Sequence, residues 1–194
     1  MTNFSDLDLN KSYTYADYLT WKFQERVELI KGKIFKMSPA PRVRHQEVSA
    51  FVMNRIYNFL FGKNCKVFSA PFDVRLTKRN KKNELVKTVV QPDICVICDP
   101  DKLDEFGCIG APDIVVEILS PGNNSKELKN KYEVYEENGV KEYWIIHPEE
   151  KTFLAYILNK KGKYETVGLK TMGDDITTPV LPGFVLKLDE VFDY

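Results

Sequence analysis

A short, almost wholly apolar segment, residues 114–119, lies near the middle of the 194-residue chain. It follows Pro112, ends at Ser120, and contains a single polar residue, Glu117. Apolar runs of this length between turn residues are typical of strands that are buried on both faces of a sheet. We therefore expect a strand at the centre of the sheet, with other elements packed on both of its faces.

Apolar spacing along the rest of the chain predicts an α/β protein. No repeat, Gly/Ser linker or low-complexity tract interrupts the sequence, so we expect a single domain over residues 1–194. The expected architecture is a central mixed β-sheet flanked by helices, with an N-terminal helix and β-hairpin. Helices are expected at 14–21, 44–61 and 125–138, and strands in a hairpin at 27–37, then at 66–76, 86–98, 114–119, 142–147 and 152–158, with a last strand at the end of the extended region 178–185.

Composition excludes several classes of protein. With 43% hydrophobic residues the chain can form a conventional core. No apolar run approaches the ~18 residues of a membrane span, and the N-terminus lacks the basic and apolar regions of an export signal. These features predict a cytoplasmic protein with no membrane partner.

The four cysteines do not form a zinc motif. Cys95 and Cys98 are three residues apart on an expected strand, so their side chains point to opposite faces and cannot chelate one ion together. We expect these two residues, Cys65 and Cys108 to be reduced, buried thiols, as is usual in the cytoplasm.

The net charge of zero hides two opposite halves. Residues 1–90 carry 17 Lys and Arg against 8 Asp and Glu, a balance of +9, whereas residues 91–194 carry 11 against 20, a balance of −9. The densest basic stretch is either a solvated loop or a surface that contacts nucleic-acid phosphates. The candidate phosphate contacts in this stretch are Arg75, Lys78, Arg79, Lys81 and Lys82.

Glu117 is the anomaly in the central strand. A lone carboxylate among apolar side chains is costly unless it pairs with another group or binds a cation. Asp113 is four residues away on the same strand, about 13 Å, which is too far to share a small ion. Asp93 belongs to the preceding expected strand, and if the two strands are neighbours, the two carboxylates supply hard oxygen ligands for one Mg²⁺ ion.

Lys131 is a second anomaly, on the helix expected at 125–138. It is three residues after Leu128 and four before Tyr135, so it shares their apolar face. Such a lysine either extends its ammonium group to solvent or, beside paired carboxylates, stabilises the charge that develops on a phosphate or positions a water. A metal ion together with a lysine suits phosphodiester hydrolysis.

At these residues and others the chain resembles the Uma-two family of restriction endonucleases, over about residues 15–192. The resemblance implies a restriction-endonuclease-like fold of the PD-(D/E)XK superfamily and a nuclease site that uses Mg²⁺, with Mn²⁺ as a substitute. The superfamily's Asp and Glu then correspond to Asp93 and Glu117, and Glu28 matches an additional acidic residue. The segments that carry the resemblance are residues 28–30, 32, 37–39, 45, 91–93, 112–121, 131, 135, 139–140 and 142–148.

One position departs from the superfamily pattern. The lysine that normally follows the acidic residue by two positions is Leu119 here. Families of this kind are expected to use a lysine from the next helix, and Lys131 is the match. The chemistry of the helix face independently indicates the same residue.

Several polar residues have alternative interpretations. Glu28 either completes the site or pairs with a basic neighbour on its hairpin, and His45 is either a supporting residue or a histidine at the edge of the core. Gln91 either orients Asp93 or is an ordinary strand residue. Asp113 is expected to start its strand and to have no catalytic role.

Three functional hypotheses follow. The first is a Mg²⁺-dependent endonuclease with DNA as its substrate and a homodimeric assembly, since two symmetric sites are the simplest way to cut both strands. The second is a non-catalytic module on the same scaffold that binds nucleic acid or protein. The third is metal-dependent hydrolysis of another phosphoester.

Overall fold

The computed structural model describes residues 3–37, 42–77, 82–121 and 125–193, which form two six-stranded sheets, one two-stranded sheet and four α-helices. The helices are α1 (Tyr15–Tyr18), α2 (Val43–Leu60), α3 (Ser125–Asn138) and α4 (Leu188–Phe192), with short 3-10 turns at Phe4–Asp6, Asn83–Leu85 and Pro100–Lys102. The central sheet has the order β12 (Tyr164–Thr171), β11 (Thr152–Leu158), β10 (Glu142–His147), β9 (Ile114–Ile118), β6 (Ile94–Ile97), β3 (Lys66–Ser69). The N-terminal sheet has the order β2 (Lys33–Lys36), β1 (Val27–Ile30), β5 (Val89–Val90), β4 (Val74–Arg75), β8 (Gly107–Ile109), β7 (Leu103–Asp104), and β13 (Asp175–Thr177) pairs with β14 (Val185–Lys187).

β9 lies inside the central sheet, as its apolar sequence predicts. It pairs parallel to β10 and antiparallel to β6. All five of its residues are buried. The mixed α/β class with a central mixed sheet is therefore confirmed.

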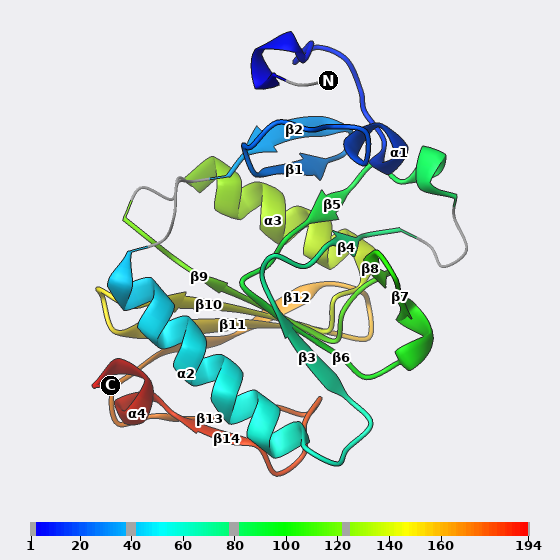
Figure 1. The fold of residues 1–194 in the computed structure, drawn as a ribbon. Coiled ribbons are helices and arrows are strands. Elements are labelled where there is room, and N and C mark those ends of the chain that lie inside the picture. Colours follow the sequence, from blue (N-terminus) through cyan, green and yellow to red (C-terminus); the bar gives the residue numbers. More distant parts are fainter. Residues whose placement is uncertain (1–2, 38–41, 78–81, 122–124, 194) are drawn as a thin grey trace.

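Two hydrophobic cores cover the two faces of this sheet. Alternate β9 residues enter different cores: Ile114 and Val116 pack with α2, α4 and β14, whereas Val115 packs with α3 and the N-terminal sheet. Figure 1 shows α2 crossing one face of the central sheet, and α3 lying between that sheet and β1–β2. Glu117 has the same parity as Val115, so its side chain faces α3.

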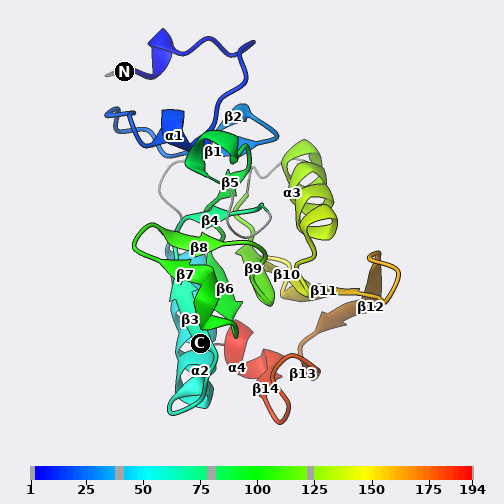
Figure 2. The same ribbon diagram turned by 90° about the vertical axis from the view of Figure 1, so that its right-hand side faces the viewer.

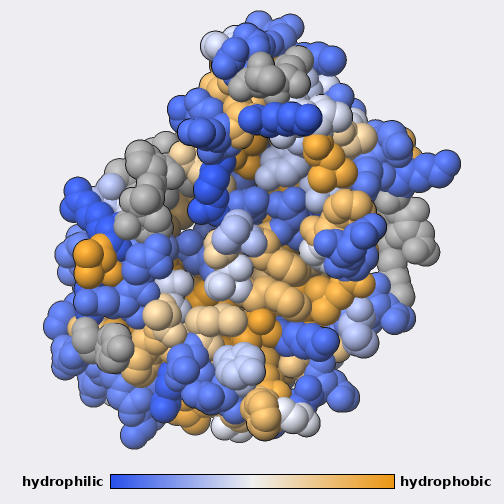
Figure 3. Space-filling view, viewed as in Figure 1, coloured by the Kyte–Doolittle hydropathy of each residue, from blue (hydrophilic) through white to orange (hydrophobic). Residues whose placement is uncertain are grey.

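Figure 2 shows the arrangement from the side. The N-terminal segment, α1, β1 and β2 form one end of the molecule, and α4 with β13 and β14 lies at the other end. On the face shown in Figure 3, apolar residues gather near the middle of the view and hydrophilic residues surround them. Among the described helices, none is both long enough and apolar enough to cross a membrane.

Two long strands predicted from the sequence are each divided in two. The expected strand 66–76 forms β3 in the central sheet and β4 in the N-terminal sheet, and 86–98 forms β5 and β6 in these same two sheets. The breaks occur at Pro71, which follows a cis peptide bond, and at Pro92. Proline has no N–H to donate to an interior ladder, so each proline ends one strand and the chain passes to the other sheet.

Other predicted elements agree, and a few were missed. The structure contains the predicted N-terminal helix (α1), the hairpin around Gly32 (β1 and β2) and the long helix (α2). It also contains the strands predicted at 142–147 and 152–158, which are β10 and β11. Helix α3 ends at Gly139, whose φ of +84° suits the left-handed position after a helix. The segment between the strands predicted at 66–76 and 86–98 lies partly outside the described residues. The missed elements are β7, β8, β12, β13 and α4. β12 is mostly exposed, and the other four are only two to five residues long.

The expectation of four reduced thiols is wrong for two of them. Cys65 and Cys98 form a disulfide. Antiparallel β3 and β6 pair Lys66 with Ile97, so one further step of this register places the two cysteines opposite each other. Cys95 and Cys108 are free and buried.

Candidate functional site

Strands β6 and β9 bring Asp93 and Glu117 together. Their register pairs Ile94 with Val116, so the next pair beyond β6 consists of these two acidic residues. The Ile118 N–H donates a hydrogen bond to Asp93 Oδ2 at 2.8 Å, which holds the Asp93 carboxylate beside the end of β9. The condition under which these two carboxylates can share one ion, that their strands are neighbours, is therefore met.

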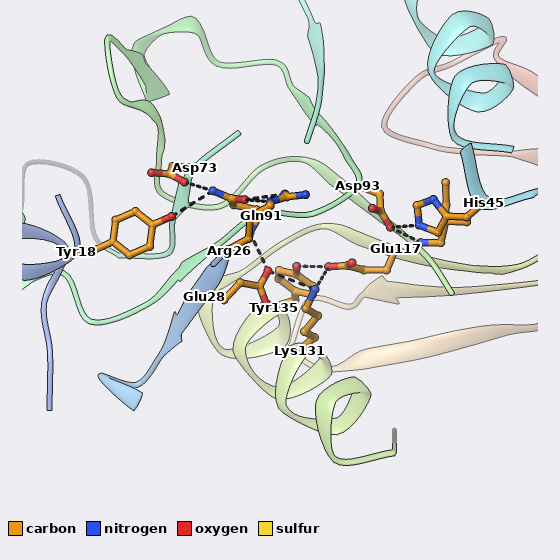
Figure 4. A network of polar contacts seen from close by, with 11 residues as sticks. Tyr18, Arg26, Glu28, His45, Asp73, Gln91, Asp93, Glu117, Lys131 and Tyr135 are labelled. Carbon is orange, nitrogen blue, oxygen red and sulfur yellow. Dashed lines mark hydrogen bonds and ion pairs between the residues drawn. The ribbon is translucent and has the colours of Figure 1, made fainter. Parts of the chain in front are cut away.

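Helix α3 supplies a cation and a hydroxyl to Glu117. Lys131 is only 5% exposed, and its Nζ lies 2.9 Å from Glu117 Oε1. One turn later, the Tyr135 hydroxyl donates to the same oxygen at 2.7 Å (Figure 4). Lys131 therefore points into the protein, and the alternative in which its ammonium group extends to solvent is wrong. Leu119, at the superfamily's usual lysine position, is buried and packs in the core beneath α3.

Glu28 joins the same cluster from β1. Its Oε1 lies 3.3 Å from Lys131 Nζ and accepts a hydrogen bond from the main-chain N–H of Gln91 at 2.9 Å. Its carboxylate is buried, so Glu28 does not make the alternative ion pair with a basic neighbour on the hairpin. The basic neighbours have other partners: Arg26 binds Gln91, Lys31 binds Glu137, and Lys33 binds the carbonyl of Asn10.

His45 and Gln91 border the cluster in different ways. His45, at the start of α2, is buried and places Nε2 3.3 Å from Asp93 Oδ2, while its Nδ1 has no hydrogen-bond partner among the described residues. The Gln91 side chain instead binds Asp73, with Nε2 2.8 Å from Asp73 Oδ1 (Figure 4). Gln91 thus contributes its main-chain N–H, and its amide does not orient Asp93.

Burial and charge together set the protonation of the cluster. Burial raises the pKa of Glu117 to about 7, the negative charges of Asp93 and Glu28 add to this effect, and Lys131 and Tyr135 oppose it. Burial lowers the pKa of Lys131, but Glu117 and Glu28 outweigh that effect and keep this pKa well above the ordinary value. Glu117 and Glu28 thus face one ammonium group, and Asp93 adds a third negative charge nearby, so an additional cation would stabilise the charged forms of these carboxylates.

The donor set suits a hard divalent cation. In the described ranges no three His, Cys, Asp or Glu side chains form a complete ligand cage. Mg²⁺ usually takes only one or two carboxylates and keeps several waters. Asp93 and Glu117 match this requirement because both are oxygen donors on adjacent strands of a rigid sheet.

Asp113 lies at the opposite end of β9 and serves the structure. Its Oδ2 accepts a hydrogen bond from the Cys98 N–H at 2.7 Å, and its Oδ1 lies 2.6 Å from Lys141 Nζ. These contacts fit the expectation that Asp113 starts the strand.

Arg75 corrects the interpretation of the basic stretch. It is 2% exposed, pairs with Asp104, and places its guanidinium 5.3 Å from the centroid of the Tyr15 ring. A guanidinium buried in this way is not available to a phosphate group, so Arg75 is not a surface contact. Lys82 is exposed, and Lys78, Arg79 and Lys81 lie outside the described residues.

Sequence reasoning missed part of this site. The hydroxyl of Tyr135 was not predicted to bind Glu117, although its spacing of four residues from Lys131 places both on one helix face. Asp73, Tyr18 and Arg26 surround the Gln91 amide, and no local pattern indicates this grouping because the residues come from separate segments.

Comparison with known proteins agrees with the fold and indicates a family. A model of the Uma2 (Uma-two) family, described as "Putative restriction endonuclease", matches residues 15–189. A curated relative, "Uncharacterized protein slr1290" of Synechocystis sp. (strain ATCC 27184 / PCC 6803 / Kazusa), is 25% identical over 132 residues, which cover 67% of this chain and 65% of that protein. A crystal structure described as a putative nuclease belonging to DUF820 from Anabaena variabilis ATCC 29413 superimposes with a TM-score of 0.73 at 21% identity, covering 93% of this chain and 98% of that one. The chain thus shares its fold with that protein.

Proposed function

Because the chain belongs to the Uma2 family of restriction-endonuclease-like proteins, we propose that it is a divalent-metal-dependent endonuclease that hydrolyses DNA phosphodiester bonds. One observation carries the proposal. Asp93 and Glu117 are register neighbours on β6 and β9, and the buried ammonium group of Lys131 contacts Glu117. Two carboxylates can hold a divalent ion, and an ammonium group beside them can stabilise the charge that develops on a phosphate.

Asp93 and Glu117 are the residues that would hold Mg²⁺ or Mn²⁺. When bound, such an ion supplies charge neutralisation of the phosphate and a water of lowered pKa. The Ile118 N–H fixes Asp93, and the Tyr135 hydroxyl fixes Glu117, so neither carboxylate has to reorganise on binding. His45 closes the Asp93 side of the site.

Lys131 is the proposed charge-stabilising residue, and Glu28 positions it. Glu28 Oε1 and Glu117 Oε1 both lie within ion-pair distance of Lys131 Nζ, at 3.3 and 2.9 Å. An ammonium group held at a fixed point near the ligands can donate to a phosphate oxygen or to the attacking water without first losing rotamer freedom. Lys131 on α3 thus takes the role of the superfamily's lysine, whose usual position is occupied by Leu119 in this chain.

The proposal extends to the setting of the enzyme. DNA is the proposed substrate, the cytoplasm the proposed compartment, and one domain over residues 1–194 the proposed unit. A homodimer follows from the requirement to cut two antiparallel strands, because a two-fold axis relates both the strands and the two sites.

Nicking of supercoiled plasmid tests the proposal. We expect wild-type protein to convert plasmid to open-circle and linear forms with Mg²⁺ or Mn²⁺ and not with EDTA. Asp93→Asn and Glu117→Gln should abolish the reaction, and Lys131→Met should slow it by about 100-fold. Asp113→Asn is the matched control, since Asp113 also follows a proline before a strand but lies at the far end of β9.

The control separates catalysis from folding. Asp113→Asn should nick at a rate close to that of wild type below its own melting temperature, which circular dichroism measures for every variant. Nicking that survives both Asp93→Asn and Glu117→Gln would contradict the proposal. A wild-type protein that nicks no DNA with either metal would favour the non-catalytic module instead.

A further inference from the structure

A pocket of about 530 Å³ lies beside the candidate site, on the other side of Gln91. It forms between the segment that follows α1, the start of β1 and Pro71. Its lining combines aromatic rings, one guanidinium and one amide. The residues that carry the argument are Tyr18, Trp21, Phe23, Arg26 and Gln91.

The aromatic wall of this pocket is held in place by ring contacts. Trp21 and Phe23 stack with centroids 5.5 Å apart and planes 28° apart, and Tyr18 lies 5.6 Å from Trp21. Behind them, the buried Tyr13 meets Trp21 edge-on at 5.4 Å. All three lining rings are partly exposed. A wall of fixed, partly exposed rings offers stacking area with little entropy cost on binding.

The polar side of the pocket is equally fixed. Arg26 Nη2 donates to Gln91 Oε1 at 2.8 Å, and Gln91 Nε2 donates to Asp73 Oδ1 at 2.8 Å and to the Tyr18 hydroxyl at 3.2 Å. Within the part of the chain that the structure describes, these bonds use two of the five N–H donors of Arg26, through Nε and Nη2. The exposed guanidinium therefore retains donors and positive charge for a ligand.

One acidic residue also lines the pocket, and it has a cation beside it. Glu25 Oε1 lies 3.9 Å from Lys36 Nζ. This ion pair reduces the repulsion that a free carboxylate would exert on an anionic ligand. The positive charge of Arg26 therefore determines the net charge of the pocket.

Gln91 connects the pocket to the candidate catalytic cluster. Its side chain lines the pocket, while its main-chain N–H donates to Glu28 Oε1 at 2.9 Å. Asp93 follows two residues later, which corresponds to roughly 7 Å of extended chain. The pocket and the proposed metal ligand Asp93 therefore adjoin the same short segment of the chain.

We propose that this pocket binds the nucleobase of an unpaired nucleotide next to the phosphate that is cleaved. The inference rests on the proposed nuclease function and adds the form of the substrate. Bases of single-stranded nucleic acid stack on aromatic side chains, and every base offers a face for this contact. A base inside a duplex has both faces covered by its neighbours, so only a single-stranded or extruded nucleotide can enter.

Tryptophan fluorescence offers a direct test, because the chain has two tryptophans and one of them cannot report. Trp144 is 1% exposed in the core, so a bound ligand changes only the emission of Trp21. The probe is a short oligothymidylate, titrated in EDTA so that no cleavage occurs. We expect saturable quenching of wild-type protein by the single strand and none by a blunt duplex of the same length and concentration.

Variants assign the signal to the pocket. Phe23→Leu and Arg26→Ala should each weaken binding about tenfold, which is the size expected for losing one stacking or charge contact. Phe61→Leu is the matched control, since Phe61 is 78% exposed beyond the end of α2 and should leave the affinity unchanged. Thermal melting confirms that each variant is folded.

These experiments test the base pocket independently of the proposed nuclease activity. Absence of quenching in wild type, equal quenching by the duplex, or unchanged affinity in both pocket variants would overturn it. Quenching that is lost in the pocket variants supports the base pocket even if plasmid nicking fails. Nicking that depends on Glu117 but not on the pocket supports the nuclease and rejects the base pocket.

Discussion

At the scale of single residues, Glu117 accounts for most of the unusual chemistry of this protein. It is 6% exposed, yet it lies among two other acidic residues and one ammonium group. The sequence alone identified it, because a carboxylate inside an apolar strand requires a partner. Local reasoning indicated Asp93 and Lys131 as its neighbours. Glu28 was indicated only by the family resemblance, because it reaches the cluster through its contact with Lys131 on α3.

Glu117 should make the stability of the protein depend on pH. Its pKa is raised from 4.5 to about 7 in the folded protein, so the folded state binds this proton more tightly than the unfolded state. The resulting stabilisation is complete below about pH 4.5 and is lost as the pH rises through about 7, a change of about 3 kcal/mol. Urea unfolding of wild type and Glu117→Gln in EDTA, from pH 5 to pH 8, measures this change.

The variant is the internal control for all other titrating groups. Glutamine cannot ionise, so the variant should gain stability relative to wild type as the pH rises. Parallel curves for the two proteins across this range would show that Glu117 is not the titrating group.

At the scale of elements, two prolines mark where the chain passes between the two large sheets, and one disulfide joins the neighbouring strands β3 and β6. Sequence patterns located nearly every buried strand and helix, because burial imposes a period of two or 3.6 residues on apolar positions. They did not reveal that Pro71 and Pro92 transfer the chain from one sheet to the other. They also missed β12, whose residues are mainly exposed and so carry little apolar alternation.

The Cys65–Cys98 disulfide should stabilise the pairing of β3 with β6. It closes a loop with a sequence separation of 33 residues, for which the chain-entropy model gives about 3 to 4 kcal/mol. We expect the double variant Cys65→Ser and Cys98→Ser to lose about this amount in urea unfolding. Reducing agent should lower the stability of wild type and leave the double variant unchanged.

Thiol titration of the denatured chain provides an independent check. Two free thiols, Cys95 and Cys108, are expected without reductant. Four free thiols would restore the original expectation of a fully reduced protein and contradict the disulfide.

At the scale of the whole molecule, the candidate site joins the two large sheets. Glu28 comes from the N-terminal sheet, Glu117 from the central sheet, and Lys131 on α3 binds both. The sequence predicted a central sheet with helices on its faces, and it paired Asp93 with Glu117 on the condition that their strands are neighbours. It did not predict a second six-stranded sheet, because strands of two or three residues leave almost no pattern.

The shared cluster should make the two sheets unfold together. Breaking a buried ion pair leaves an uncompensated charge and is strongly unfavourable. In a Trp144→Phe variant, Trp21 alone reports on the N-terminal part of the chain, whereas far-UV circular dichroism reports on all of it. We expect the two urea curves to coincide, and a Trp21 transition at clearly lower urea would show that the N-terminal sheet opens independently.

Calorimetric titration of Mn²⁺ into the metal-free protein tests the proposed metal centre most directly. We expect saturable binding to wild type and loss of that binding in Asp93→Asn and Glu117→Gln. Binding should be retained in Asp113→Asn, because the Asp113 carboxylate of the wild type contacts Lys141 at the far end of β9. Absence of binding to wild type, or binding that is unchanged in Glu117→Gln, would contradict the assignment of Asp93 and Glu117 as a metal-dependent nuclease centre.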